Sequence, residues 1–176
     1  MIVRELEQEF ENPEPGMHNA VCFNIFDLGV QKIEWQKEIK FRPQLIIGWE
    51  LEAKNAKGER FKKYKKYTAN LHEKALLRQH LESWRNKAFT DEELKGFNLD
   101  NIIGKQCTLN LIKDQKYINI SGVMAKMPNV SQIQPETSRD WTPEWVEKLQ
   151  NNAQKVKAED NEGNSDITCE DEQIPF

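Results

Sequence analysis

Lysine and tyrosine side chains alternate in one short stretch of the chain, Lys62-Lys63-Tyr64-Lys65-Lys66-Tyr67. Ammonium groups bind phosphates, and aromatic rings provide flat faces on which unpaired bases stack. The aromatic rings distinguish this stretch from a plain charge run, so the pattern predicts contact with a single-stranded nucleic acid. Three further candidates for such contacts are Trp35 in a polar connection and Lys116 and Tyr117 near the start of a strand.

Each of these candidates has an alternative role that the sequence leaves open. The lysine run is also compatible with a solvated loop, and Tyr64 and Tyr117 are compatible with ordinary surface positions. Trp35, which is flanked by polar residues, either stacks on a base or covers one end of the fold. Trp49 shares the parity of apolar strand residues, which favours the core over a ligand contact.

The charge of the chain is divided between a basic body and an acidic C-terminal segment. The formal net charge is −4, but residues 158–176 contain seven acids and neither Lys nor Arg. The remaining residues carry 25 basic against 22 acidic side chains, and residues 54–87 alone carry eleven against three. Because a polyanion responds to local potential rather than to net charge, a nucleic acid is compatible with this chain.

The acidic segment has a distinctive ending, in which three acids precede three apolar residues: Glu170, Asp171, Glu172, Ile174, Pro175 and Phe176. The ring of Phe176 provides an anchor, the proline reduces the entropy lost on docking, and the acids steer the segment towards a basic pocket. We therefore predict that these six residues bind partner proteins. The alternative is a solvated acidic tail that happens to end in phenylalanine.

Five stretches of the chain have the features of β-strands. Apolar and polar residues alternate in them, and turn-forming residues separate them. Gly29 indicates the end of the first strand or a bulge, and Pro43 indicates an edge position or a bulge early in the second. The expected strands are residues 17–28, 39–52, 64–71, 105–112 and 117–124.

Helical periodicity occurs between the third and fourth strands and again after the fifth. An apolar stripe that includes Trp84 predicts a helix over residues 73–87, with this tryptophan in the core. Thr90 begins a capping-box spacing that fits a short second helix. A third helix begins near Thr142 and extends to about residue 157.

This order of elements is that of the oligonucleotide-binding (OB) fold, a five-stranded Greek-key barrel with a helix between strands three and four. We expect a mainly β protein with such a barrel, a C-terminal helix and a disordered acidic tail. The expected division is an N-terminal lead-in (1–16), an OB-fold DNA-binding domain (17–128), a linker with the C-terminal helix (129–157) and a disordered protein-interaction tail (158–176).

Two parts of the sequence resemble single-stranded DNA-binding proteins. Residues 170–176, Glu-Asp-Glu-Gln-Ile-Pro-Phe, closely resemble the acidic tip of the bacterial proteins, although Gln173 replaces the last acid. The body resembles a group of bacteriophage single-stranded DNA-binding proteins, through Asp27-Leu28-Gly29, Trp49-Glu50-Leu51 and Gly96-Phe97-Asn98-Leu99 among other blocks. The resemblance implies an OB-fold, single-stranded DNA as ligand, and recruitment of replication and repair proteins by the tip.

Motifs of enzymes and metal sites are absent from the sequence. The three histidines lack metal-ligand spacing, the three cysteines are far apart, and neither a glycine-rich phosphate loop nor a nucleophile elbow occurs. We therefore expect no enzymatic activity, no cofactor and no metal, and we expect the cysteines to be free thiols.

The chain has no apolar run long enough to cross a bilayer and no signal-peptide core, which predicts a cytosolic protein, in the host cytosol if a phage encodes it. The expected function is sequence-tolerant binding and protection of single-stranded DNA in phage DNA replication and recombination. A homo-oligomer is compatible with the sequence. Two alternatives are an OB-fold adaptor that binds only proteins and an RNA-binding OB protein.

Overall fold

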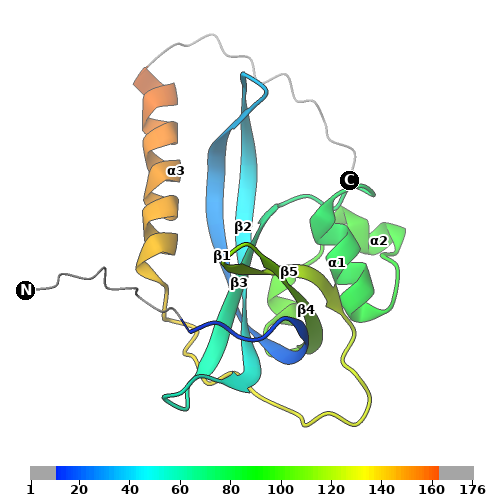
Figure 1. The fold of residues 1–176 in the computed structure, drawn as a ribbon. Helices are drawn as coiled ribbons and strands as arrows, with labels where there is room; N and C mark the ends of the chain where they lie inside the picture. Colours follow the sequence, from blue (N-terminus) through cyan, green and yellow to red (C-terminus); the bar gives the residue numbers. More distant parts are fainter. Residues whose placement is uncertain (1–10, 163–176) are drawn as a thin grey trace, which may run out of the picture.

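The computed structural model describes residues 11–162, and it shows a mainly β protein built on one five-stranded antiparallel sheet (Figure 1). The strand order is β3-β2-β1-β4-β5. The elements are, in chain order, β1 (Gly16–Trp35), β2 (Glu38–Lys54), β3 (Arg60–Thr68), α1 (Leu76–Arg85), α2 (Asp91–Lys95), the 3₁₀-helix η1 (Leu99–Ile102), β4 (Gln106–Asp114), β5 (Tyr117–Met124) and α3 (Glu144–Glu162).

The five predicted strands, the helical insertion and the C-terminal helix are thus all present. The hydroxyl of Thr90 accepts a hydrogen bond from the backbone N–H of Glu93, which confirms the predicted cap of α2. α3 extends to Glu162, beyond the predicted end at residue 157. The remainder of the predicted disordered tail lies outside the described residues.

β1 and β2 form a long hairpin, in which β1 continues to Trp35, well beyond its predicted end at residue 28, whereas β2 nearly matches its predicted range of 39–52. Their pairing continues as far as Trp35 and Glu38, whereas β3 pairs with β2 only from Gln44 onwards, so two strands extend alone beyond the sheet (Figure 1). The turn residues Gln36 and Lys37 have φ values of 47° and 65°. A two-residue hairpin turn of this type needs a left-handed pair, which Asn-Gly usually supplies, and the absence of that signal explains why the first strand was predicted to end too early.

Gly29 and Pro43 lie where this hairpin leaves the body, and both positions confirm their predictions. The strand register shifts between Asp27 and Gly29, which has a φ of +64°. A Cβ atom at Gly29 would lie only 3.1 Å from the Cβ of Ala153, so the glycine also allows α3 to approach β1. Pro43 pairs with Val30 of β1, one residue before the β2–β3 ladder begins at Gln44, and its carbonyl oxygen accepts a hydrogen bond from the N–H of Ala69 (2.8 Å), so it lies at the end of that ladder, an edge position.

The sheet is open, whereas a barrel was predicted. No backbone pairing joins the edge strands β3 and β5 in the described part of the chain. The two edges nevertheless lie side by side, because Lys63 Nζ donates to the carbonyl oxygen of Ile118 (2.5 Å) and Lys65 Nζ to that of Ile120 (3.4 Å). Lysine side chains thus take the place of a backbone ladder, which the order of elements alone could not reveal.

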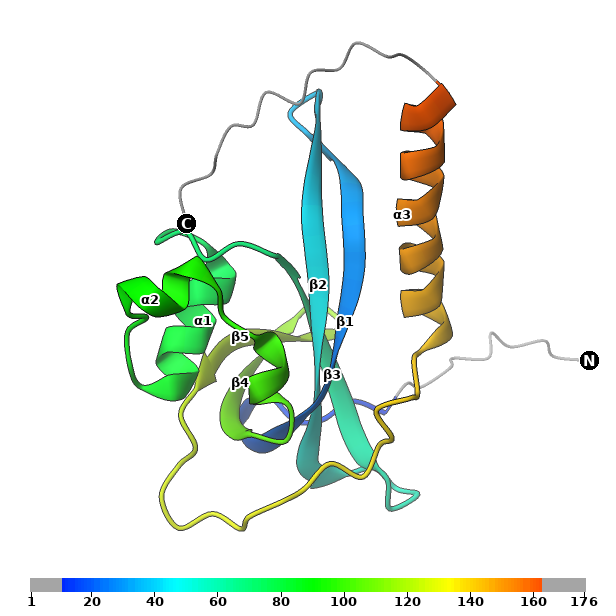
Figure 2. The same ribbon diagram turned by 180° about the vertical axis from the view of Figure 1, so that it is seen from behind.

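Apolar clusters lie on both faces of the sheet. The larger cluster packs the inner face against α1 and includes Trp49 and Trp84, both predicted core residues that are buried in the structure. The smaller cluster lies on the outer face beneath α3, whose Val146 is fully buried; its other buried members are Phe23, Phe26, Leu28 and Ile46. Figure 2 shows α3 on one side of the β1–β2 hairpin and α1 with α2 on the other.

Each of the five buried polar side chains of the described part bonds to the backbone of the segment that follows β5. The pairs are Thr108 Oγ1 with Met127 N (3.2 Å), Asn19 Nδ2 with Ser131 O (3.1 Å), Glu50 with Glu136 N and Thr137 N (2.9 and 2.7 Å), Asn24 Nδ2 with Arg139 O (2.9 Å) and Gln31 Nε2 with Leu149 O (2.8 Å). Because a buried polar group without a partner costs about 1–3 kcal/mol, these side chains specify the path of the segment.

Glu50 depends most strongly on its hydrogen-bond partners, because it is a carboxylate with only 1% of its surface exposed. Arg60 lies 3.2 Å from it and also donates to the carbonyl oxygen of Gln134. Burial opposes the ionisation of Glu50, but the hydrogen bonds from Glu136, Thr137 and Arg60 prevail and lower its pKa below the ordinary value of 4.5. The carboxylate is therefore charged in the folded protein at neutral pH.

We predict that Glu50→Gln lowers the free energy of unfolding at pH 7 by about 2–4 kcal/mol, because it removes the buried carboxylate that faces Arg60 and weakens two backbone hydrogen bonds. The folded pKa of Glu50 is depressed, so its stabilisation is present above about pH 4.5 and is lost as the pH falls through the folded value. Urea denaturation followed by circular dichroism should show a steeper loss of stability below pH 4.5 in the wild type than in the variant. The control Glu59→Gln, at an exposed position, should change stability by less than about 0.5 kcal/mol; equal effects would refute the assignment.

Candidate nucleic-acid interface

The lysine–tyrosine run lies entirely within β3, where successive side chains point to opposite faces. Lys63 and Lys65 point towards β5 and bind its carbonyl oxygens, and burial lowers the pKa of Lys63. Lys62 and Lys66 lie on the outer face and are exposed. The predicted run therefore divides into two lysines that hold the sheet together and two that are free to meet a ligand.

Tyr64 lies on the outer face of β3, but its ring is packed under α3 and is not the exposed stacking face that the sequence predicted. The ring centroid lies 5.1 Å from that of Trp145 and 5.9 Å from that of Phe23, in both cases edge to face. Burial and, to a smaller extent, the charge of Glu50 raise the pKa of Tyr64 to about 12. The ring thus helps to hold α3 on the sheet and supports the surface above it.

Two tryptophans that were not predicted as ligand contacts lie beside β3, Trp141 against Lys62 and Trp145 against Tyr64. Trp141 precedes α3 and is 42% exposed, and Trp145 lies in the first turn of α3 and is 45% exposed. Lys62 Nζ lies 5.2 Å from the centroid of the Trp141 ring, a cation–π distance. The sequence did contain an indication of this site, because two tryptophans in the otherwise polar stretch 138–148 suggest an interaction surface.

These residues form a surface that is fixed before any ligand arrives. Asn24 holds the carbonyl oxygen of Arg139, just before Trp141, and Val146 is buried just after Trp145. We call the set Lys62, Lys66, Trp141 and Trp145 the aromatic–lysine surface. Chemically it combines two ammonium groups that can bind phosphates with two partly exposed indoles that can stack on planar groups.

Trp35 does not belong to this surface. It lies at the tip of the β1–β2 hairpin and is 64% exposed, so it does not cover an end of the sheet (Figure 1). It pairs with Glu38, ten residues along β2 from Gly48, the partner of Tyr64. At about 3.3 Å per residue this separation is about 33 Å. A single ligand could contact both Trp35 and the aromatic–lysine surface only if it extended along the hairpin.

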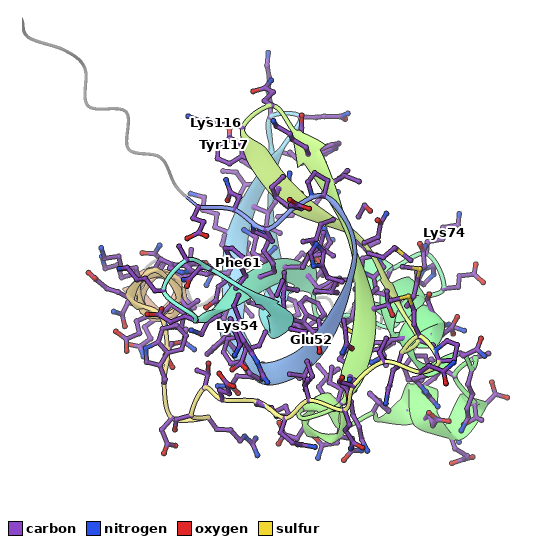
Figure 3. The ribbon with its side chains drawn as sticks, turned by 60° about the horizontal axis from the view of Figure 1, so that its bottom comes forward. Glu52, Lys54, Phe61, Lys74, Lys116 and Tyr117 are labelled. Atoms are coloured by element: carbon purple, nitrogen blue, oxygen red, sulfur yellow. The ribbon has the colours of Figure 1, made fainter. Side chains whose placement is uncertain are left out.

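Lys116 and Tyr117 lie at the turn between β4 and β5 (Figure 3). Tyr117 is 59% exposed, and Lys116 Nζ lies 5.4 Å from the centroid of its ring. The lysine bridges from β3 to Ile118 and Ile120 place these residues at the neighbouring sheet edge. This pair is therefore near the strand that carries Lys62, but it belongs to the β4–β5 turn and, within the described residues, contacts none of the four side chains of the aromatic–lysine surface.

The predicted partner-binding residues, 170–176, lie outside the described residues. Cys22 and Cys107 are buried free thiols, and burial raises the pKa of Cys22 to about 12. Within the described part, no three His, Cys, Asp or Glu side chains are grouped to hold a metal ion, and none of the helices there is long and apolar enough to cross a membrane. No protein-family model matches the chain, and no curated protein matches it.

Because the lysine run is divided in this way, the same substitution should change stability by different amounts at Lys63 and at Lys66. Lys63→Met removes the donor to Ile118 O and should lower the free energy of unfolding by about 1–2 kcal/mol. Lys66→Met makes the same change on the exposed outer face and should cost less than about 0.5 kcal/mol. Urea denaturation monitored by circular dichroism measures both values. Equal stabilities of the two variants would show that the lysine bridge does not hold β5 to β3.

Proposed function

We propose that this protein binds and protects single-stranded DNA with little sequence preference during DNA replication and recombination, and that residues 170–176 recruit partner proteins. The resemblance of residues 17–128 to bacteriophage single-stranded DNA-binding proteins, and of the tip to bacterial ones, supports this proposal. The ligand site we propose is the aromatic–lysine surface, extended by Lys116 and Tyr117 on the neighbouring edge.

The arrangement of elements supports assignment to the OB class. The OB-fold is a five-stranded, partly open Greek-key barrel that often binds oligonucleotides on the face of strands two and three. Here the helical insertion lies between β3 and β4, and the side chains of Lys62 and Lys66 lie on the outer face of β3, next to β2. The open edge between β3 and β5 is compatible with this class.

The observation that carries the proposal is that two partly exposed indoles lie over β3, Trp141 against Lys62 and Trp145 against Tyr64. Each indole is anchored by packing against the sheet, Trp141 on Phe23 (6.2 Å between centroids) and Trp145 on Tyr64. Because these rings are already fixed, stacking a base on them does not require a further loss of side-chain conformational entropy. Because every base has a flat face and every nucleotide a phosphate, stacking and ion pairing bind DNA without reading its sequence.

We predict that Trp141→Ala weakens binding to oligo-dT by about 1–3 kcal/mol, the usual contribution of one stacked base. Titration with quenching of tryptophan fluorescence at low salt measures the affinity, and a thermal melt checks the fold. The matched control Ile112→Ala removes an exposed apolar side chain from β4 and should leave the affinity unchanged. If the wild type does not bind oligo-dT at low salt, DNA binding is rejected in favour of a protein adaptor; stronger binding to an RNA competitor would favour the RNA-binding alternative.

We further predict that Lys62→Ala and Lys66→Ala each reduce the slope of log K against log salt by about 0.7, because each removes one phosphate contact on a single strand. Oligo-dT titrations at several salt concentrations give the slope. Lys95→Ala, at an exposed position on α2, removes the same charge elsewhere and should not change it. Unaltered slopes in the first two variants would place the phosphates on other cations, with Lys116 the next to test.

A further inference from the structure

A pocket of about 440 Å³ lies between α1, η1 and the start of β4. Its floor is apolar and includes Trp84 and Ile102, both buried, and Trp84 is fixed by a hydrogen bond from its Nε1 to the carbonyl oxygen of Gln106 (2.7 Å). The pocket is lined by residues of α1, η1 and β4, whereas Trp145 lies in α3, and Figure 2 shows α1 and α3 on opposite sides of the β1–β2 hairpin. It is therefore separate from the proposed DNA site.

The rim of this pocket is positively charged. Four cations line it, Arg85, Lys87, Lys105 and Lys126, and no acid does. The charge of Arg85 is partly neutralised by its ion pair with Glu93, and its Cζ atom lies 4.5 Å from the centroid of the Phe89 ring. Lys105 and Lys126 are exposed and form no ion pair with any residue of the described part. Such a site suits a ligand that combines a bulky apolar group with several negative charges.

The chain itself contains a segment of this chemistry. Residues 166–176 contain Asp166, Glu170, Asp171 and Glu172 but no Lys or Arg, and they also contain Ile174 and Phe176. A cavity of about 150 Å³ accommodates a benzene ring, so the pocket is large enough for a phenylalanine side chain. The fourteen residues from 163 to 176 can span up to about 46–50 Å from the end of α3, and attachment to the same chain raises their effective concentration.

We propose that this pocket binds residues 166–176 of the same chain, with the ring of Phe176 on the floor formed by Trp84 and Ile102 and the acids on Lys105 and Lys126. This proposal does not depend on DNA binding. The docked segment would leave the aromatic–lysine surface free, and a partner protein would have to compete with the pocket for the same residues. The pocket thereby regulates when the segment is available for recruitment.

Photo-cross-linking of the full-length protein tests this proposal. Phe176→p-benzoylphenylalanine introduces a photoreactive ring, and mass spectrometry after irradiation of dilute protein locates the product. We expect cross-links within one chain to residues 81–87 or 101–106. Cross-links to β3 or the start of α3, cross-links found only between chains, or none at all would each overturn the proposal.

Charge variants in the same photoreactive background make the test specific. Lys105→Glu combined with Lys126→Glu should lower the cross-link yield by at least about fivefold, as should Glu170→Gln, Asp171→Asn and Glu172→Gln together. Lys62→Glu combined with Lys66→Glu is the matched control and should leave the yield unchanged. A yield that does not respond to reversal of the rim charges overturns the proposal. Oligo-dT titration of the Lys105→Glu, Lys126→Glu protein keeps the two proposals distinguishable, since its affinity should equal that of the wild type whether or not the pocket binds the segment.

Discussion

The structure depends on the hydrogen bonds between buried polar side chains of the sheet and the backbone that follows β5. Thr108, Asn19, Glu50, Asn24 and Gln31 bond in turn to positions from Met127 to Leu149. If this segment left the sheet, all five side chains would exchange these hydrogen bonds for bonds to water, at a net loss of about 0.5–1.5 kcal/mol for each bond. The segment and α3 are therefore part of the fold, and the face that they cover is not free to take a ligand directly.

This constraint determines which aromatic side chains a ligand can reach. Phe23 and Tyr64 are aromatic side chains on the outer face of the sheet, but they are covered and support the rings of Trp141 and Trp145. The reachable rings thus come from the C-terminal part of the chain and the cations from β3. A surface assembled from two distant segments and anchored by packing is rigid, which reduces the entropy lost on binding.

Lysine side chains of β3 have two different roles at the open edge of the sheet. Unpaired edges invite pairing with other chains, and lysines on an edge oppose it. Lys63 and Lys65 point their ammonium groups at carbonyl oxygens of β5, while Lys62 and Lys66, one residue away in each case, remain in solvent. One run of like charges therefore serves both cohesion and the proposed recognition, because successive side chains of a strand point to opposite faces.

The sequence by itself determined the elements and much of the core, because local periodicity and capping depend on near neighbours. The alternation in β5, the apolar stripe with Trp84 and the cap at Thr90 all gave correct predictions. Turn residues without Gly or Asn concealed the length of the β1–β2 hairpin. Only the tertiary structure decided that the sheet stays open, that Tyr64 is covered and that Trp141 lies over Lys62. These three outcomes depend on how α3 and the edge strands pack, which involves contacts between residues far apart in the chain that no local pattern encodes.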